Sequence, residues 1–269
     1  MNIDTQKPSM GVLNLQGGEK RFNLSRLPAA EALSYFVKHY WIVRWNSRDD
    51  EPYMQHVVPN PCVNLIVEPG KTMIYAPSTQ KFTYPIYGEG LVFGVKFKPG
   101  GFYPFLKRPV SRLLNRPLEV SAILDMNGPE LEGTILSLGD EQAMAIVMDK
   151  LLLSKLPPQD EQVFQINRII DFIAEEKDLS KVDAVCEHFQ IHIRKLQRLF
   201  DQYVGISPKW VIRLYRLQNA AEIMDLRMPI DLSQLAMELG YHDQSHFIKD
   251  FKAVVGCTPD EYRRNVQNG

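Results

Sequence analysis

The sequence is poor in cysteine and has no long hydrophobic run. Its 269 residues include three cysteines, Cys62, Cys186 and Cys257, and no two of them form a CxxC pair. Cysteines spaced in this way predict reduced thiols, with neither a disulfide framework nor a bound metal. No stretch of about eighteen apolar residues could span a bilayer, and the first residues, MNIDTQKPSM, lack the features of a signal peptide. We therefore expect a cytoplasmic protein that makes no membrane contact.

The sequence also lacks a strong charge and the common catalytic motifs. A net charge of −1 gives no general attraction to a polyanion, so any binding of nucleic acid must depend on local charge. No GxSxG, GxGxxG or Walker pattern occurs. The N-terminal part holds the histidines His39 and His56, too few for a metal-binding cupin. We expect no enzyme activity and no cofactor.

The N-terminal part has β-type patterning. Residues 37–45 alternate, so that Val37, His39, Trp41, Val43 and Trp45 share one face of a strand. Before them we expect irregular chain and a short helix, and after them a compact antiparallel sheet or barrel. Short helices should follow within 101–135, where prolines are frequent. The further predicted strands are CVNLIVEPG (62–70), KTMIYAP (71–77) and LVFGVKFKPG (91–100).

Beyond residue 140 the pattern becomes helical. The helix predicted over 141–156 is ended by Pro157-Pro158, where we place the domain boundary. The predicted fold class is therefore α+β, with a β-rich regulatory domain over 1–157 and an all-α domain over 158–269. The helices expected in the second domain span 161–176, 181–189, 192–203, 208–225, 231–239, 243–254 and 259–265.

One segment of the all-α domain occurs twice. KLQRLFDQYVGISPKW (195–210) and HFIKDFKAVVGCTPDE (246–261) share a helix, a glycine and a hydroxyl-proline pair. Gly205 and Gly256 are placed to cap the second helix of each unit in the left-handed conformation. With a short helix and a tight turn before it, each unit has the spacing of a helix-turn-helix. Solenoids need three or more contiguous repeats, so two units separated by a long helix favour DNA binding.

The helix between the units has a length that suits two DNA-binding units in successive major grooves. Its buried face is predicted to hold Trp210, Leu214, Leu217, Ala221 and Met224. Eighteen helical residues, 208–225, extend about 27 Å. With the adjoining ends included, the second helices of the two units could lie about 34 Å apart, the spacing of successive major grooves on one face of B-DNA.

These residues resemble the DNA-binding domain of the AraC/XylS family of bacterial transcription regulators. The resemblance covers 161–265 and is carried by LAMELGYHDQSHFIKDFK followed by VGCTPDEYRR. The first unit departs from the family at Cys186, Gln190 and His192, where alanine, glycine and a serine cap are usual. The family implies double-stranded DNA as a partner at promoter sites, a homodimer, and RNA polymerase as a further partner.

The candidate DNA contacts lie on the second helix of each unit. Arginine pairs with guanine and glutamine with adenine, so Arg194 and Gln197 are candidates for base readout. Arg194 and Arg198 could equally contact phosphate, and for Lys249 phosphate contact is favoured. His242 and His246 have a spacing that metals use, but no third ligand is in view. The full set is Ile193, Arg194, Gln197, Arg198, Lys209, Arg213, Gln244, Ser245, His246, Lys249 and Arg263.

The N-terminal domain resembles, through FGVKFKPGGFYPFL (93–106), a sensor-like domain found fused to such DNA-binding domains. The resemblance implies a domain that binds an effector or dimerises. Trp41, Trp45, His56 and Lys96 are candidates for lining a small-molecule pocket, but core packing accounts for most of the aromatic residues on these strands. The helix 141–156 would either form a dimer or pack on its own domain through Ala143, Ile146, Val147, Leu151 and Leu153. A domain that only dimerises is the alternative, and an enzymatic domain is a further one. A methyl-transfer repair protein is disfavoured because Pro61-Cys62-Val63-Asn64 lacks the required histidine.

Overall fold

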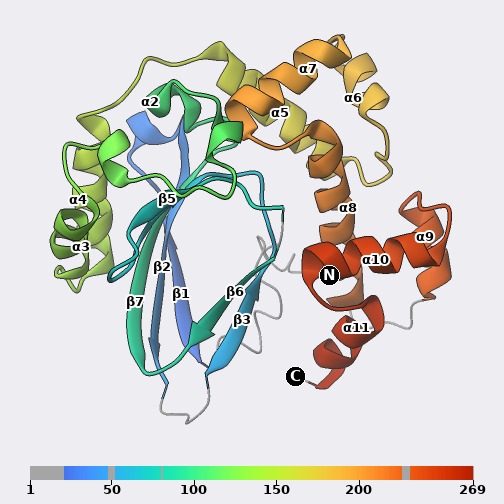
Figure 1. Cartoon of the computed structure of the whole chain (residues 1–269), viewed down its shortest axis with the longest axis horizontal. Coiled ribbons are helices and arrows are strands. Elements are labelled where there is room, and N and C mark those ends of the chain that lie inside the picture. Colours follow the sequence, from blue (N-terminus) through green and yellow to red (C-terminus); the bar gives the residue numbers. More distant parts are fainter. Residues whose placement is uncertain (1–20, 48–51, 80, 226–230, 269) are drawn as a thin grey trace, which may run out of the picture.

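The computed structural model describes residues 21–47, 52–79, 81–225 and 231–268. Strands occupy the N-terminal part, and helices alone form the C-terminal part (Figure 1). The fold class is thus α+β, as predicted. The N-terminal elements are β1 (Phe22–Leu27), η1 (Glu31–Leu33), β2 (Val37–Asn46), β3 (Tyr53–Val57), β4 (Asn64–Val67), β5 (Met73–Tyr75), β6 (Phe82–Ile86), β7 (Glu89–Phe97), α2 (Tyr103–Leu106), η2 (Val110–Leu113), η3 (Val120–Ala122), α3 (Gly128–Leu136) and α4 (Glu141–Leu153).

The main sheet has five antiparallel strands in the order β1-β2-β7-β4-β5. In its central pair, Trp41 lies opposite Gly94 and Trp45 opposite Gly90. A β-carbon on Gly94 would lie 1.9 Å from the Trp41 ring, and one on Gly90 would lie 2.0 Å from the Trp45 ring. The two glycines therefore make the space in which the indole rings lie over the neighbouring strand.

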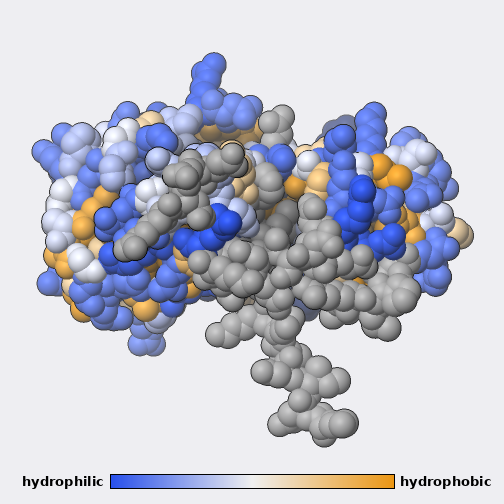
Figure 2. Space-filling view, turned by 90° about the horizontal axis from the view of Figure 1, so that it is seen from below, coloured by the Kyte–Doolittle hydropathy of each residue, from blue (hydrophilic) through white to orange (hydrophobic). Residues whose placement is uncertain are grey.

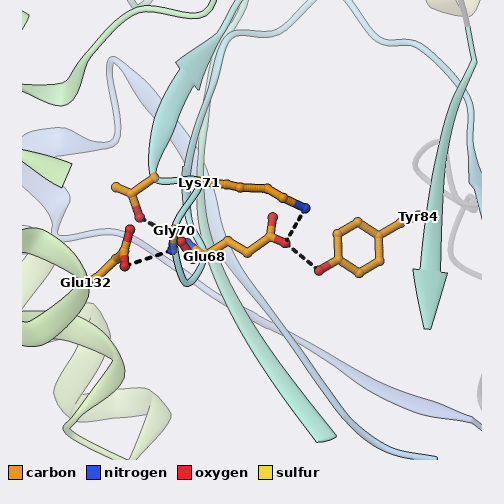
Figure 3. A network of polar contacts seen from close by, with 6 residues as sticks. Glu68, Gly70, Lys71, Tyr84 and Glu132 are labelled. Carbon is orange, nitrogen blue, oxygen red and sulfur yellow. Dashed lines mark hydrogen bonds and ion pairs between the residues drawn. The ribbon is translucent and has the colours of Figure 1, made fainter. Parts of the chain in front are cut away.

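A second sheet pairs β3 with β6, two strands that the sequence patterns did not predict. A polar network joins this sheet to the main one (Figure 3). The Tyr84 hydroxyl donates to Glu68 Oε1 over 2.7 Å, and Lys71 lies 3.5 Å from the same oxygen. The amide of Gly70 in turn donates to Glu132 of α3 over 3.0 Å. These contacts hold the β4–β5 turn between a helix and the second sheet.

Helices α3 and α4 cover one face of the main sheet, with Tyr40, Phe93 and Phe97 fully buried beneath. Asp149 of α4 fixes the packing, because its Oδ1 accepts from the Tyr40 hydroxyl over 2.7 Å and from the Ala30 amide over 2.9 Å. The residues that α4 buries in this core are Met144, Ala145, Met148 and Leu152.

The apolar face predicted for this helix is only partly used for packing on its own domain. Ile146 is 45% exposed and Leu153 is 38% exposed. Both residues point away from the core of their own domain, so packing on that domain does not use them.

The C-terminal elements match the helices predicted from sequence closely. They are α5 (Glu161–Glu175), α6 (Val182–His188), α7 (Ile193–Leu199) with a π-helical turn η4 (Phe200–Val204), α8 (Pro208–Asp225), α9 (Leu232–Glu238), α10 (Gln244–Val255) and α11 (Pro259–Asn268). Two separate hydrophobic cores form, one for each helix-turn-helix unit.

Helix α8 belongs to both cores. Val211 and Ile212 are buried in the core of the first unit, and Leu214, Leu217 and Met224 are buried in the core of the second. In Figure 1 the first unit lies at one end of α8 and the second at the other. Because both ends of the helix are anchored by packing, it acts as a rigid spacer between the two units.

Candidate nucleic-acid interface

The second helix of the first unit presents a polar and basic face. In α7, Leu196 and Leu199 are buried, whereas Arg194, Gln197 and Arg198 are exposed. Ile193 is also partly exposed, at 36%. The structure thus places all four predicted contact residues of this helix at the surface, where they could reach a ligand.

His192 supplies the cap that starts this helix. Its Nδ1 accepts a hydrogen bond from the amide of Arg194 over 3.2 Å. An imidazole nitrogen can therefore take the role that serine or aspartate oxygens usually fill at a helix N-terminus. In the second unit Asp243 plays the same part, accepting from the His246 amide over 2.8 Å.

The turns of the two units have the same hydrogen bonds. The Ile191 amide donates to Cys186 O over 3.0 Å, and the Tyr241 amide donates to Ala236 O over 2.9 Å. The residue before each amide has a positive φ, 49° at Gln190 and 71° at Gly240. Gln190 therefore adopts, at some cost, the left-handed conformation that glycine adopts freely in the second unit. The first unit therefore makes the same turn with glutamine that the second unit makes with glycine.

The second helix of the second unit is less basic. On α10, Ser245, His246 and Lys249 are exposed. Gln244 is half-buried, and its Oε1 accepts a hydrogen bond from the Ser233 hydroxyl over 3.0 Å. His246 Nδ1 lies 3.1 Å from the capping carboxylate of Asp243. Two of the candidate side chains therefore already have partners within the protein.

The three remaining candidates differ in their surroundings. Lys209 is exposed in the first turn of α8. Arg213 forms an ion pair with Asp250 of α10 over 3.3 Å, which ties α8 to the second unit. Arg263 lies 3.4 Å from Asp260 on its own helix. Among these three, Lys209 is the most accessible cation.

The candidate effector residues of the N-terminal domain do not form one pocket. Trp41 and Trp45 lie over Gly94 and Gly90, and Lys96 lies at the far end of the same strand, β7. The backbone of His56 belongs to the second sheet, and its side chain lies outside the described residues. Lys96 lines a cavity between the two domains, and Trp45 lines a separate, more open pocket at the other end of β7.

Two segments of the chain match protein families. Residues 185–265 match a family described as a helix-turn-helix domain, and residues 25–119 match a domain of unknown function, DUF6597. The F1 operon positive regulatory protein of Yersinia pestis is 31% identical over 100 residues, 36% of this chain and 33% of that protein. The arabinose operon regulatory protein of Salmonella typhimurium is 29% identical over 154 residues, 51% of this chain and 53% of that protein.

The C-terminal domain is an AraC-type helix-turn-helix domain. The AraC-type domain is thus the part of the chain that resembles known regulators most clearly. Alignments with these two relatives cover about a third and about half of their own lengths.

Solved structures give a weaker likeness. ToxT from Vibrio cholerae with a bound unsaturated fatty acid has a TM-score of 0.39 and 15% identity, over 96% of this chain and 97% of that one. The C-terminal domain of AraT, a response regulator from Geobacillus stearothermophilus, has a TM-score of 0.34 and 28% identity, over 36% of this chain and 82% of that one.

Membrane-spanning helices and metal sites are both absent from the described part of the chain. No helix there is both long and apolar enough to cross a bilayer. The histidine, cysteine and acidic side chains of the same residues form no group of three or more that could hold a metal ion. On the face shown in Figure 2, the visible described residues are mostly hydrophilic, with hydrophobic ones in small groups.

Proposed function

We propose that this protein is a sequence-specific DNA-binding regulator of transcription, controlled through its N-terminal domain. The observation that carries the proposal is the anchoring of two helix-turn-helix units at opposite ends of α8. A rigid spacer of about 27 Å suits two helix-turn-helix units that enter successive major grooves. The AraC-type domain and the similarity to operon regulators point the same way.

The first unit would supply most of the sequence readout. Arg194 and Gln197 are exposed on α7, and their side chains are the types that bond bidentately to guanine and adenine. On α10, Ser245 and Lys249 are free to reach DNA, whereas Gln244 would first have to leave Ser233. We therefore expect the two half-sites to contribute unequally to affinity.

The test begins with selection of genomic fragments by the purified full-length chain, followed by footprinting of the best fragment. We expect protection of roughly two helical turns for each chain. Arg194→Ala and Gln197→Ala should each weaken binding to the selected fragment by about 1–3 kcal/mol. The control Arg108→Ala removes an exposed arginine of the N-terminal domain and should leave the footprint unchanged. No enriched sequence with the full-length chain would refute the proposal.

Regulation by the N-terminal domain is the finer part of the proposal. An effector bound there would change how the two units reach DNA, and transcription of the selected promoter with RNA polymerase would show whether output rises or falls. The alternative, a domain that only dimerises, is favoured by the exposed Ile146 and Leu153 on α4. Sedimentation of wild type and of an Ile146→Glu, Leu153→Glu double variant tests whether a dimer uses α4. Saturable binding of a small molecule, which a domain that only dimerises would lack, distinguishes the two alternatives.

A further inference from the structure

A cavity of about 600 Å³ lies between the two domains. Its N-terminal side is formed by Lys96, at the end of β7, and by the segment Asn60-Pro61-Cys62. Helices α5 and α8 form its C-terminal side, contributing Asn167 and Arg216 among others. The volume falls within the range of pockets that bind small molecules.

Lys96 is the most unusual residue of this cavity. The whole residue is 8% exposed, and no hydrogen bond or ion pair joins its ammonium to another residue that the structure describes. Burial is the main cause that lowers the pKa of Lys96. Lys96 lines the cavity, and charged groups in protein interiors are normally paired.

The neighbouring thiol cannot be the missing partner. Cys62 is buried, and burial raises the pKa of its thiol above the usual range. The thiol is therefore neutral near pH 7 and carries no charge to compensate Lys96. An ammonium at Lys96 would therefore take its counter-charge from a ligand in the cavity.

Two further polar atoms at the cavity are unsatisfied. Asn60 Oδ1 and Arg216 Nε are both buried without a hydrogen-bond partner among the described residues. Arg216 is nevertheless held in place, since its guanidinium donates to Leu239 O and lies 4.4 Å from the centre of the Tyr241 ring. Unpaired buried polar atoms of this kind are uncommon, and several at one cavity suggest a ligand.

The charged groups that line the cavity are mostly positive. Against them stand three carboxylates, and burial raises the pKa of one of them, Glu222. The cations are Lys38, Lys96, Lys98, Arg168, Lys177 and Arg216, and the carboxylates are Asp171, Glu176 and Glu222. The cavity therefore favours a negative ligand.

We propose that the cavity between the domains binds a small organic anion, whose oxyanion group pairs with Lys96 and which donates a hydrogen bond to Asn60 Oδ1. Carboxylates and phosphate monoesters both supply the oxyanion, and the donor to Asn60 Oδ1 is a separate hydroxyl or N–H group of the same molecule. The inference deepens the proposed function by assigning its effector site, although binding of the anion can be measured without DNA. A ligand that touches the sheet domain and α8 together would bias the placement of the two DNA-binding units.

The experiment is a thermal-shift screen of the full-length protein against organic acids, phosphate monoesters and the neutral amide of each acid. Ligands of the native state raise the melting temperature by mass action. We expect stabilisation by acids or phosphate esters and none by the matching amides. The two anionic classes identify which source of the oxyanion is bound. Calorimetry on the strongest stabiliser then gives the affinity for each variant.

Lys96→Met removes the charge and keeps the length of the side chain. Because it removes an unpaired buried charge, the variant should melt no lower than wild type without ligand. It should bind the stabiliser at least about 30-fold more weakly. Asn60→Asp, which adds a competing carboxylate, should also weaken binding. The control Lys107→Met alters an exposed lysine outside the cavity and should bind as wild type does.

The inference is overturned if no anionic member of the panel stabilises the wild-type protein, or if Lys96→Met binds the stabiliser with unchanged affinity. Footprinting of the selected DNA fragment is a separate measurement. If the wild-type protein binds no anion of the panel but still gives the footprint, the effector site alone is refuted. A missing footprint with intact anion binding would instead refute the proposed function.

Discussion

Gly205 ends the second helix of the first unit, α7 with η4, and packs against Val110 of the N-terminal domain. A β-carbon on Gly205 would lie 2.9 Å from Val110 Cγ1 and 3.1 Å from the Val110 carbonyl carbon. Gly256 ends the corresponding helix of the second unit, and a β-carbon there would meet the flexible side chain of Lys81. The two caps have nearly the same φ, 90° and 92°.

Alanine at these two positions should therefore have different effects. Each substitution forces a left-handed conformation on alanine, which costs about 1–2 kcal/mol. Gly205→Ala in addition pushes against the backbone of the other domain, which adds about 1–3 kcal/mol. Thermal melting followed by circular dichroism should show the larger decrease for Gly205→Ala. Equal decreases in the melting temperature would mean that Val110 and its neighbours move aside without a cost in stability.

A second contact between the domains depends on Asp160, the residue before α5. Its Oδ2 accepts from the Tyr203 hydroxyl over 2.6 Å, and its carbonyl accepts from the Tyr35 hydroxyl over 2.5 Å. Tyr203→Phe removes a hydrogen bond to a carboxylate, which should lower the free energy of unfolding by about 1–2 kcal/mol. Tyr262→Phe is the matched control, because it removes a similar 2.8 Å bond to Asp225 within the second unit.

The two variants should differ in limited proteolysis. If Tyr203 holds the linker through Asp160, Tyr203→Phe should speed cleavage near 154–160, because the linker opens more often. Tyr262→Phe should leave the cleavage rate at that site unchanged. The same rate for both variants would show that the linker is held by other contacts.

Much of the C-terminal domain could be predicted from sequence, because its helices carry their boundaries locally. Gly205 and Gly256 end helices, and Pro208 and Pro259 begin them. Such signals depend on backbone conformation within a few residues, so they need no knowledge of tertiary contacts.

The N-terminal domain was harder to predict. Strands β1, β3 and β6 were missed, since short strands depend on partners distant in sequence. For α4 the sequence left open whether its apolar face packs on its own domain or forms a dimer, and contact with the sheet decides which of its apolar residues are buried. The four candidate effector residues were grouped by chemical type, and the strand register places Lys96 apart from Trp45.

His39 should make stability depend on pH. It lies opposite Lys96 in the β2–β7 register, and burial, followed by the charges of Lys96, Arg26 and Lys38, lowers the pKa of His39 to about 4. Between about pH 6.5 and 4 the unfolded chain binds a proton that the folded chain does not. The contribution of His39 is therefore present above pH 6.5 and is lost as the pH falls towards 4.

Partial exposure of His39 reduces the expected size of this effect to about 1–2 kcal/mol. Urea denaturation at several pH values would measure it. His39→Gln should flatten the decrease in stability between pH 6.5 and 4 relative to wild type. His242→Gln, a substitution at an exposed position, should leave the wild-type slope unchanged. A slope that is the same in His39→Gln and wild type would contradict the assignment.

The last prediction separates base contacts from phosphate contacts in the first unit. Lys209 is exposed at the start of α8, and we propose that it contacts the DNA backbone rather than a base. Lys209→Ala should therefore weaken binding to selected and unrelated DNA alike and reduce the slope of log K against log salt by about 1. Arg194→Ala should instead cost about 1–3 kcal/mol on the selected sequence alone.

Binding titrations at four salt concentrations, on the selected fragment and on a scrambled one, measure both effects together. If Arg194 contacts phosphate as Lys209 does, the two variants will change the salt slope equally and leave the ratio between fragments intact. That ratio is the quantity that decides, because a phosphate contact carries no sequence information whereas a bidentate contact to guanine does. A lowered ratio in Arg194→Ala with an unchanged ratio in Lys209→Ala assigns base readout to the exposed face of α7.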